Sequence, residues 1–134
     1  MIVVDTNIIS YLLIPNDRYN QLADELFEKD SNWISPILWR HELLNVLSIY
    51  LRRNIINSTA CKSIYQEAVE TVTSRPISDF EKVFNIVKNS NLSSYDCEFV
   101  ALANENKLPL ITEDKKITRE FPDIACTIKA YLNR

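Results

Sequence analysis

Four acidic residues stand where their carboxylates could do metal-ion chemistry. Asp5 directly follows the apolar run Ile2-Val3-Val4, and Asp114 closes the segment Leu110-Ile111-Thr112-Glu113-Asp114. In open parallel sheets, ligands bind beyond the carboxyl ends of strands. If the two apolar runs are neighbouring strands, the sequence predicts that both carboxylates reach one cleft.

Two further acids lie at positions with helical spacing. Glu42 interrupts a largely apolar stripe, and a buried carboxylate is costly unless it has a cation or a hydrogen-bonding partner. Asp96 stands three residues after Ser93, in the expected first turn of a helix. Each acid also has a structural interpretation. Asp5 and Asp114 could cap helices, Glu42 could lie at the edge of a buried face, and Asp96 could complete a capping box.

Bringing these acids together would demand a counter-charge. Two like charges about 4 Å apart repel by about 4 kcal/mol at an effective dielectric near 20, and a divalent cation reverses that sign. Hard oxygen ligands favour Mg²⁺ or Mn²⁺ over zinc or copper. Such ions activate water and neutralise charge at a transferring phosphate, so we expect phosphodiester hydrolysis. The single histidine, His41, excludes a histidine-rich metal site.

Short apolar strands and helices alternate along the chain. Expected strands cover residues 2–4, 33–35, 75–77, 109–112 and 125–127. Expected helices cover residues 7–14, 16–29, 36–53, 57–73, 78–89 and 93–106. The second helix is capped by Asn16 or Asp17, the fourth by Asn57 or Ser58 and the fifth by Ser78, and Pro36 lies in the first turn of the third. This alternation predicts a parallel sheet covered by helices and joined by right-handed crossovers.

Composition narrows the class of protein. With 134 residues, 46% hydrophobic and 25% charged, we expect one globular domain over residues 1–134. The amino-terminal residues lack a signal-peptide pattern, and no run approaches the roughly 20 apolar residues of a membrane span. The odd set of Cys61, Cys97 and Cys126 fits reduced thiols, so we expect a cytoplasmic protein with no membrane association.

Glycine is absent from the sequence. A P-loop and a dinucleotide fingerprint both need glycine, so no nucleotide cofactor is expected. Asparagine tolerates positive φ best among the other residues. We therefore expect Asn54, Asn89, Asn91 and Asn106 at helix ends.

The ordered motifs resemble one family, the PIN domain, and within it the bacterial and archaeal VapC-like ribonuclease toxins of type II toxin–antitoxin systems. The resemblance runs nearly end to end and rests on Val3-Val4-Asp5-Thr6-Asn7-Ile8-Ile9, Glu42, Tyr95-Asp96 before Val100-Ala101-Leu102-Ala103, and Leu110-Ile111-Thr112-Glu113-Asp114. It implies a PIN-like three-layer α/β fold with a central parallel sheet of about five short strands flanked by helices. It also implies a metal-dependent endoribonuclease.

The resemblance assigns roles to particular residues. It implies catalytic and metal-binding roles for Asp5, Glu42, Asp96 and Asp114, with Asp5 and Asp96 holding the principal Mg²⁺ or Mn²⁺ ion and Asp114 helping a second. Asn7 and Thr112 would be supporting polar residues that orient carboxylates or water. The implied partners are an RNA substrate, a cognate antitoxin that covers the cleft, and a second copy of the chain in a homodimer.

The charge balance is unusual for an RNA-binding protein. The net charge is −3 and the pI near 5.2, whereas nucleic-acid binding usually uses a basic surface. Candidate substrate contacts are Arg40, Lys115 and Lys116, with Arg52, Arg53 and Arg119 as further basic residues. Relatives often place glycine in loops near the site, so we expect different loop paths here.

Three other functions fit parts of the pattern. A phosphatase of the haloacid dehalogenase type needs a second acid two residues after the first, where this chain has Asn7. A response-regulator receiver domain has no place for Glu42 and normally carries paired acids after its first strand. A PIN-like module that binds RNA or protein without cutting is the non-enzymatic alternative, and the presence of all four acids favours the nuclease.

Overall fold

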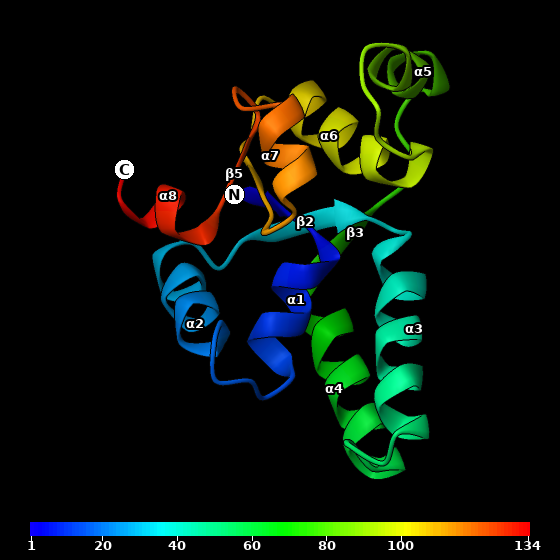
Figure 1. Ribbon diagram of the computed structural model, residues 1–134, viewed down its shortest axis with the longest axis vertical. Coiled ribbons are helices and arrows are strands. Elements are labelled where there is room, and N and C mark those ends of the chain that lie inside the picture. The colour runs from blue at the N-terminus through cyan, green and yellow to red at the C-terminus, as the bar shows by residue number, and fades with distance from the viewer.

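The computed structural model describes residues 1–134 and is built around a five-stranded parallel sheet (Figure 1). The strands are β1 (Ile2–Val4), β2 (Trp33–Pro36), β3 (Val72–Arg75), β4 (Leu110–Ile111) and β5 (Ala125–Cys126). Their order across the sheet is β3-β2-β1-β4-β5, and every neighbouring pair is parallel. The predicted α/β class with about five short parallel strands is confirmed.

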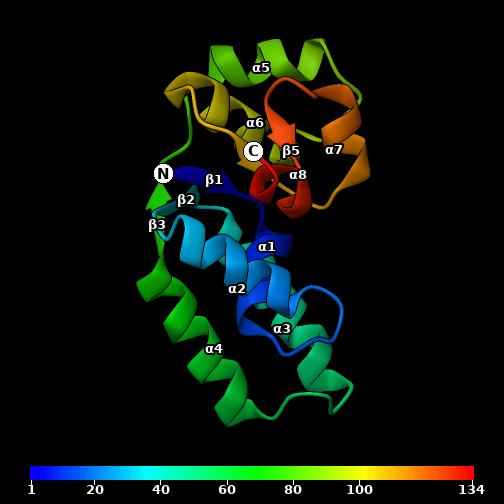
Figure 2. The ribbon, with the colours of Figure 1, turned by 90° about the vertical axis from the view of Figure 1, so that its left-hand side faces the viewer.

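Helices cover both faces of this sheet. They are α1 (Thr6–Leu13), α2 (Asn20–Lys29), α3 (Trp39–Arg52), α4 (Ser58–Thr71), α5 (Phe80–Lys88), α6 (Ser94–Asn106), α7 (Lys115–Glu120) and α8 (Ile128–Leu132). Figures 1 and 2 show α5, α6 and α7 on one face and α1 to α4 on the other. The chain runs from β1 outward to β3 and then returns to β4. Right-handed crossovers in opposite directions place their helices on opposite faces.

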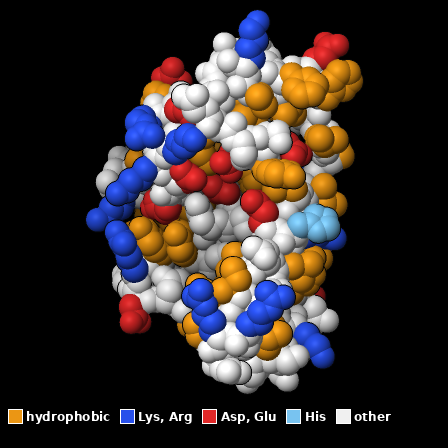
Figure 3. Space-filling view, turned by 45° about the vertical axis from the view of Figure 1, so that its right-hand side comes forward, with side chains coloured by type: hydrophobic (Ala, Val, Ile, Leu, Met, Phe, Trp, Pro, Cys, Tyr) orange, Lys and Arg blue, Asp and Glu red, His pale blue; other side chains and the backbone are white.

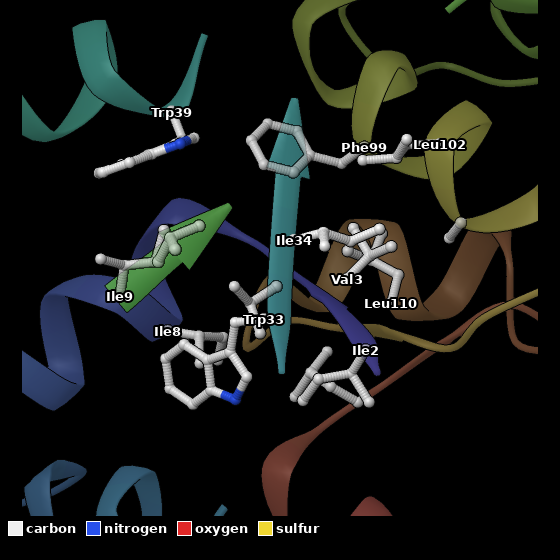
Figure 4. Close-up of a cluster of buried hydrophobic side chains, with 14 of the residues drawn as sticks. Ile2, Val3, Ile8, Ile9, Trp33, Ile34, Trp39, Phe99, Leu102 and Leu110 are labelled. Atoms are coloured by element: carbon white, nitrogen blue, oxygen red, sulfur yellow. The ribbon is translucent and has the colours of Figure 1, made fainter. Parts of the chain in front are cut away.

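The core lies between the helices and both faces of the sheet. It contains 28 buried hydrophobic residues, among them the fully buried Ile2, Val3 and Val4 of the central strand. Figure 4 shows Ile2 and Val3 within this cluster. Trp33, Trp39 and Phe99 are the largest of its fully buried side chains. Burying a large apolar side chain contributes about 1.5–3 kcal/mol, so this core holds the strand ends in place.

In the crossover from β2 to β3, the end of β2 and the position of β3 differ from the sequence prediction. Pro36 is the last residue of β2 and pairs with Arg75, so α3 begins at Trp39 and not at Pro36. The strand expected at residues 75–77 is β3 at 72–75, where the β-branched Val72 and Thr73 pair with β2. The helices α3 and α4 pack against each other as a hairpin.

Several helix ends also differ by a few residues. The second helix begins at Asn20, because Asn16 accepts a hydrogen bond from the Tyr19 amide and forms a turn before it. Asp79, not Ser78, caps α5, whereas Asn57 and Ser93 cap α4 and α6 as predicted.

Two residues adopt positive φ. Asn54 does so as predicted, at 56°, but the left-handed residue that ends α6 is Lys107, at 55°, and not Asn106. The short helix α8 was not predicted, and α7 was anticipated only through the interpretation of Asp114 as a helix cap. All three cysteines are free thiols, and only Cys97 is fully buried. No helix is long and apolar enough to cross a membrane.

Candidate metal centre

A cleft opens at the carboxyl ends of the two strands where the strand order changes direction. Asp5 follows β1, and Asp114 follows β4, the neighbour of β1. The cleft has a volume of about 440 Å³ and is lined by Asp5, Thr6, Asn7, Ser10, Tyr11, Glu42, Asn45, Val46, Tyr50, Asp96 and Asp114. Acidic side chains gather in this hollow in Figure 3. The fold therefore brings all four predicted acids, and Asn7, to one place.

Asp5 both caps a helix and lines the cleft. Its Oδ1 accepts a hydrogen bond from the Thr6 amide at 2.7 Å, at the start of α1. Its Oδ2 accepts from the Thr112 hydroxyl at 2.6 Å and from the Asn7 amide group at 3.4 Å. The side chain is only 8% exposed. The capping and cleft interpretations of Asp5 are thus compatible.

Thr112 connects the ends of the two central strands. Its hydroxyl is buried, donates to Asp5 and accepts from the Asp114 amide at 3.0 Å. The Asn7 side chain lies within 3.5 Å of the same hydroxyl and accepts from the Glu113 amide. Thr112 does not line the cleft itself, so it acts by orienting Asp5 and the loop that carries Asp114.

The other three acids approach from separate helices. Glu42, in the first turn of α3, accepts a hydrogen bond from the Thr6 hydroxyl at 2.7 Å. Asp96 lies in the first turn of α6, where its amide donates to the cap Ser93. Asp114 caps α7 by accepting from the amides of Lys116 and Ile117. Glu42 is thus held by a side chain of α1 and Asp114 by backbone amides, and all three acids line the cleft.

The electrostatics of the cleft disfavour negative charge. Burial raises the pKa of Asp5 to about 6, and the nearby Glu42 and Asp96 add to this rise, while the Thr112 and Thr6 hydrogen bonds oppose it. Burial also raises the pKa of Glu42 and of Asp96 above their usual values. For Asp96 the Asp114 carboxylate adds to the effect, and Lys116 opposes it. The protein holds acids together although they repel one another.

No basic side chain compensates this charge at close range. The only ion pair within 4 Å in the chain joins the amino terminus to Asp30, away from the cleft. No three Asp, Glu, His or Cys side chains are placed to hold one metal ion by themselves. Mg²⁺ commonly keeps several waters and uses only one or two carboxylates, so these oxygen donors fit a hydrated Mg²⁺ or Mn²⁺ ion.

The predicted basic contacts lie outside the cleft lining. Arg40 is two positions from Glu42 on α3 and so points in another direction, with its guanidinium 5.9 Å from the Trp39 ring centroid. Lys115 and Lys116 are exposed at the start of α7, and Lys116 is close enough to lower the pKa of Asp96.

Sequence reasoning missed part of the lining. These residues are Thr6, Ser10, Tyr11, Asn45, Val46 and Tyr50. Helical spacing could have found most of them. Ser10 and Tyr11 lie three and four positions after Asn7, and Asn45 lies three positions after Glu42.

The architecture is that of an all-parallel α/β protein with an acidic cleft at its topological switch point. The model of the PIN domain family matches residues 2–121, so this chain belongs to the PIN domain family. A similar curated protein is Ribonuclease VapC3 of Pyrobaculum aerophilum, 24% identical over 125 residues, which are 90% of this chain and 95% of that protein.

Solved structures share the fold over nearly the whole chain. PAE2754 from Pyrobaculum aerophilum aligns with a TM-score of 0.79 and 17% identity, over 98% of this chain and 93% of that one. A toxin–antitoxin complex from Klebsiella pneumoniae aligns with a TM-score of 0.69 and 19% identity, over 96% and 98%. VapC20 of Mycobacterium tuberculosis, a toxin that cleaves the sarcin–ricin loop, aligns at 0.65 with 15% identity, over 89% and 94%.

Proposed function

We propose that this PIN-domain protein is a metal-dependent endoribonuclease, the toxin of a toxin–antitoxin pair. Its proposed catalytic and metal-binding residues are Asp5, Glu42, Asp96 and Asp114, with Asn7 and Thr112 in support. The observation that carries the proposal is the convergence of four carboxylates, without a cation within 4 Å, at the switch point of the sheet. The names of similar proteins agree with this activity.

The chemistry follows from what the residues can do. When bound, Mg²⁺ or Mn²⁺ supplies a more acidic water molecule and positive charge beside an RNA phosphate. Asp5 and Asp96 would hold the principal ion, and Asp114 would help hold a second. Thr112 and Asn7 fix the Asp5 carboxylate through the hydrogen bonds to its Oδ2. Because Asp5 has a pKa near 6, it is ionised and able to bind a cation at neutral pH.

The surface around the cleft suits a polyanion. Lysine and arginine side chains stand along one border of the acidic hollow and below it (Figure 3). RNA phosphates would contact this basic border while one phosphate reaches the ions at the centre. This arrangement reconciles a net charge of −3 with an RNA substrate.

The test is cleavage of a panel of folded cellular RNAs by purified protein with MgCl₂ or MnCl₂. Asp96→Asn is the inactivating variant, and EDTA removes the ions. Asp24→Asn, which neutralises an exposed acid on α2, is the matched control for loss of one negative charge. We expect cleavage by the original chain and by the control, and none with EDTA or by Asp96→Asn.

One outcome would favour a PIN-like module that binds RNA without cutting it. If every RNA stays intact while the original chain and Asp96→Asn bind RNA equally well, the protein is a binding module and not a nuclease.

The proposed partners are an antitoxin and a second copy of the chain, in the cytoplasm. Co-purification with the product of a neighbouring open reading frame, and loss of cleavage on its addition, would support the antitoxin. Light scattering of the isolated protein separates a dimer of about twice 15.6 kDa from a monomer.

A further inference from the structure

The cleft changes character away from its acidic end. Along α1 the lining residues pass from Asn7 to Ser10 and Tyr11, and along α3 from Glu42 to Asn45 and on to Tyr50. Positions three and four apart lie on one side of a helix, so both rows face the same cleft. With a rise of about 1.5 Å per residue, Tyr11 lies roughly 6 Å beyond Asn7 along the helix axis.

The ring of Tyr11 is held in a fixed orientation. It stacks on Tyr19 with the ring centroids 4.3 Å apart and the planes inclined by 22°. The Arg18 guanidinium lies 5.0 Å from the Tyr19 centroid and extends this stack. Tyr19 and Arg18 are outside the cleft lining, whereas Tyr11 lines the cleft. One part of the Tyr11 ring is therefore packed and another part is available to a ligand.

Polar groups beside the two tyrosines lack partners within the protein. The Ser10 hydroxyl oxygen is buried and makes no hydrogen bond. Asn45 is exposed at the cleft, and its side-chain amide can both donate and accept hydrogen bonds. Because the Ser10 oxygen is enclosed by protein atoms, Asn45 is the polar group beside the tyrosines that a ligand can reach.

We propose that Tyr11, Tyr50 and Asn45 form a nucleobase-binding subsite next to the carboxylates. Aromatic rings accept an unpaired base by stacking, and an amide side chain can hydrogen-bond to its edge. The cleft presents carboxylates first, then the Asn45 amide, and then aromatic rings. A nucleotide presents phosphate, ribose and base in the same order. The total volume of about 440 Å³ lies within the range of small-molecule sites, roughly 300–1,000 Å³.

The subsite rests on the proposed function for its choice of RNA as ligand, and it adds a requirement. The nucleotide beside the cut must be unpaired, because a base stacked in a duplex cannot reach the tyrosines. Tyr11, Tyr50 and Asn45 are thus positioning and specificity-determining residues, separate from the four carboxylates.

Binding of a defined probe tests the subsite without requiring cleavage. The probe is a fluorescein-labelled, mixed-sequence RNA of ten nucleotides, used as a single strand, as a duplex, and as a set of strands with one abasic ribose at successive positions. Affinity is measured by fluorescence anisotropy in CaCl₂ at low temperature, with probe integrity checked on gels. The proteins are the original chain, Tyr11→Ala, Tyr50→Ala and Tyr131→Ala, the last being a half-buried tyrosine on α8 outside the cleft.

The subsite predicts a specific pattern of affinities. Tyr11→Ala and Tyr50→Ala should weaken single-strand binding by about 5- to 150-fold, the equivalent of about 1–3 kcal/mol per stacked base, and Tyr131→Ala should not. For at least one abasic probe, the affinity for the original chain should be as low as the affinity of the intact probe for Tyr11→Ala. The affinity of that abasic probe should fall little further when the protein is Tyr11→Ala. The duplex should be insensitive to both cleft substitutions.

Failure of the subsite and failure of the nuclease are distinguishable. If abasic and intact probes bind the original chain equally well, the subsite is wrong whatever the variants do, and RNA cleavage can still stand. If the predicted affinities are found but no RNA is cut, the subsite stands and the proposed activity fails. A variant that loses its circular dichroism spectrum is replaced by Tyr11→Leu, and the abasic series needs no variant at all.

Discussion

Replacing Asp5 with asparagine should change protein stability in a pH-dependent way. In the folded chain the Asp5 carboxyl has a pKa of about 6, raised mainly by burial, whereas its ordinary value is 3.8. Between these pH values the folded state holds a proton that the unfolded state has released, so the stability of the metal-free protein falls as pH rises. A shift of this size corresponds to about 3 kcal/mol, since one pH unit is worth about 1.4 kcal/mol.

The asparagine variant lacks this titration. Its side chain makes weaker hydrogen bonds with Thr112 and Thr6, which lowers the free energy of unfolding by about 1 kcal/mol at any pH. We therefore expect Asp5→Asn to be about 0.5 kcal/mol less stable than the original chain near pH 4 and about 2 kcal/mol more stable near pH 8. At roughly 4 °C per kcal/mol, the difference in Tm should change sign across this range.

Urea unfolding in EDTA at pH 4, 6 and 8 measures the effect, with fluorescence of the buried Trp33 and Trp39 as the signal. Asp24→Asn, an exposed acid on α2, is the control and should follow the original chain at every pH. Parallel stability curves for Asp5→Asn and the original chain would refute the reasoning, because they would mean that Asp5 ionises normally in the folded protein. Saturating Mg²⁺ should remove the advantage of the variant at pH 8.

Three further predictions concern the cleft and one helix end. MnCl₂ at 100 times its Kd at pH 7.5 should stabilise the original chain by about 2.7 kcal/mol. The same concentration should stabilise it less at pH 5.5, because Asp5 must be ionised to bind the ion. An equal Tm gain in Asp96→Asn would contradict a site at this cleft. Thr112→Val should lower the free energy of unfolding by about 1–3 kcal/mol, because Asp5 loses a buried hydrogen-bond donor. It should also raise the pKa of Asp5 above about 6, as measured by carboxyl ¹³C NMR. An unchanged pKa would show that the hydroxyl does not stabilise the carboxylate. Lys107→Gly should stabilise the protein by about 0.5–1 kcal/mol in thermal unfolding, since Lys107 has φ 55°, whereas Lys107→Val should destabilise it.

The sequence predicted the centre of the fold better than its periphery. β1 is a short apolar run buried on both faces, so it is visible without its neighbours. The position of β3 depends on pairing with Trp33 and Ile34 about 40 residues earlier, and that non-local contact leaves no local pattern. The helices α7 and α8 are 6 and 5 residues long, too short for a reliable helical period.

The candidate site was predictable for a similar reason. An acid directly after a buried strand has its position fixed by the strand, as Asp5 does. Tyr11 and Tyr50 were overlooked because an aromatic residue at helical spacing usually belongs to the core, although both line the cleft. Arg40 stays a predicted substrate contact outside the cleft lining, since its distance of two positions from Glu42 turns it away from the cleft.

The hydrogen bond from Thr112 to Asp5 joins residues 107 positions apart. Asp5 leaves the ribosome more than 100 residues before the partner strand β4 and the Asp114 loop. During synthesis one edge of the central strand β1 therefore stays unpaired, and the acidic cleft has only part of its wall. A protein built in this way cannot complete its cleft before the segment through Asp114 has emerged, so any RNA cleavage must wait for that segment.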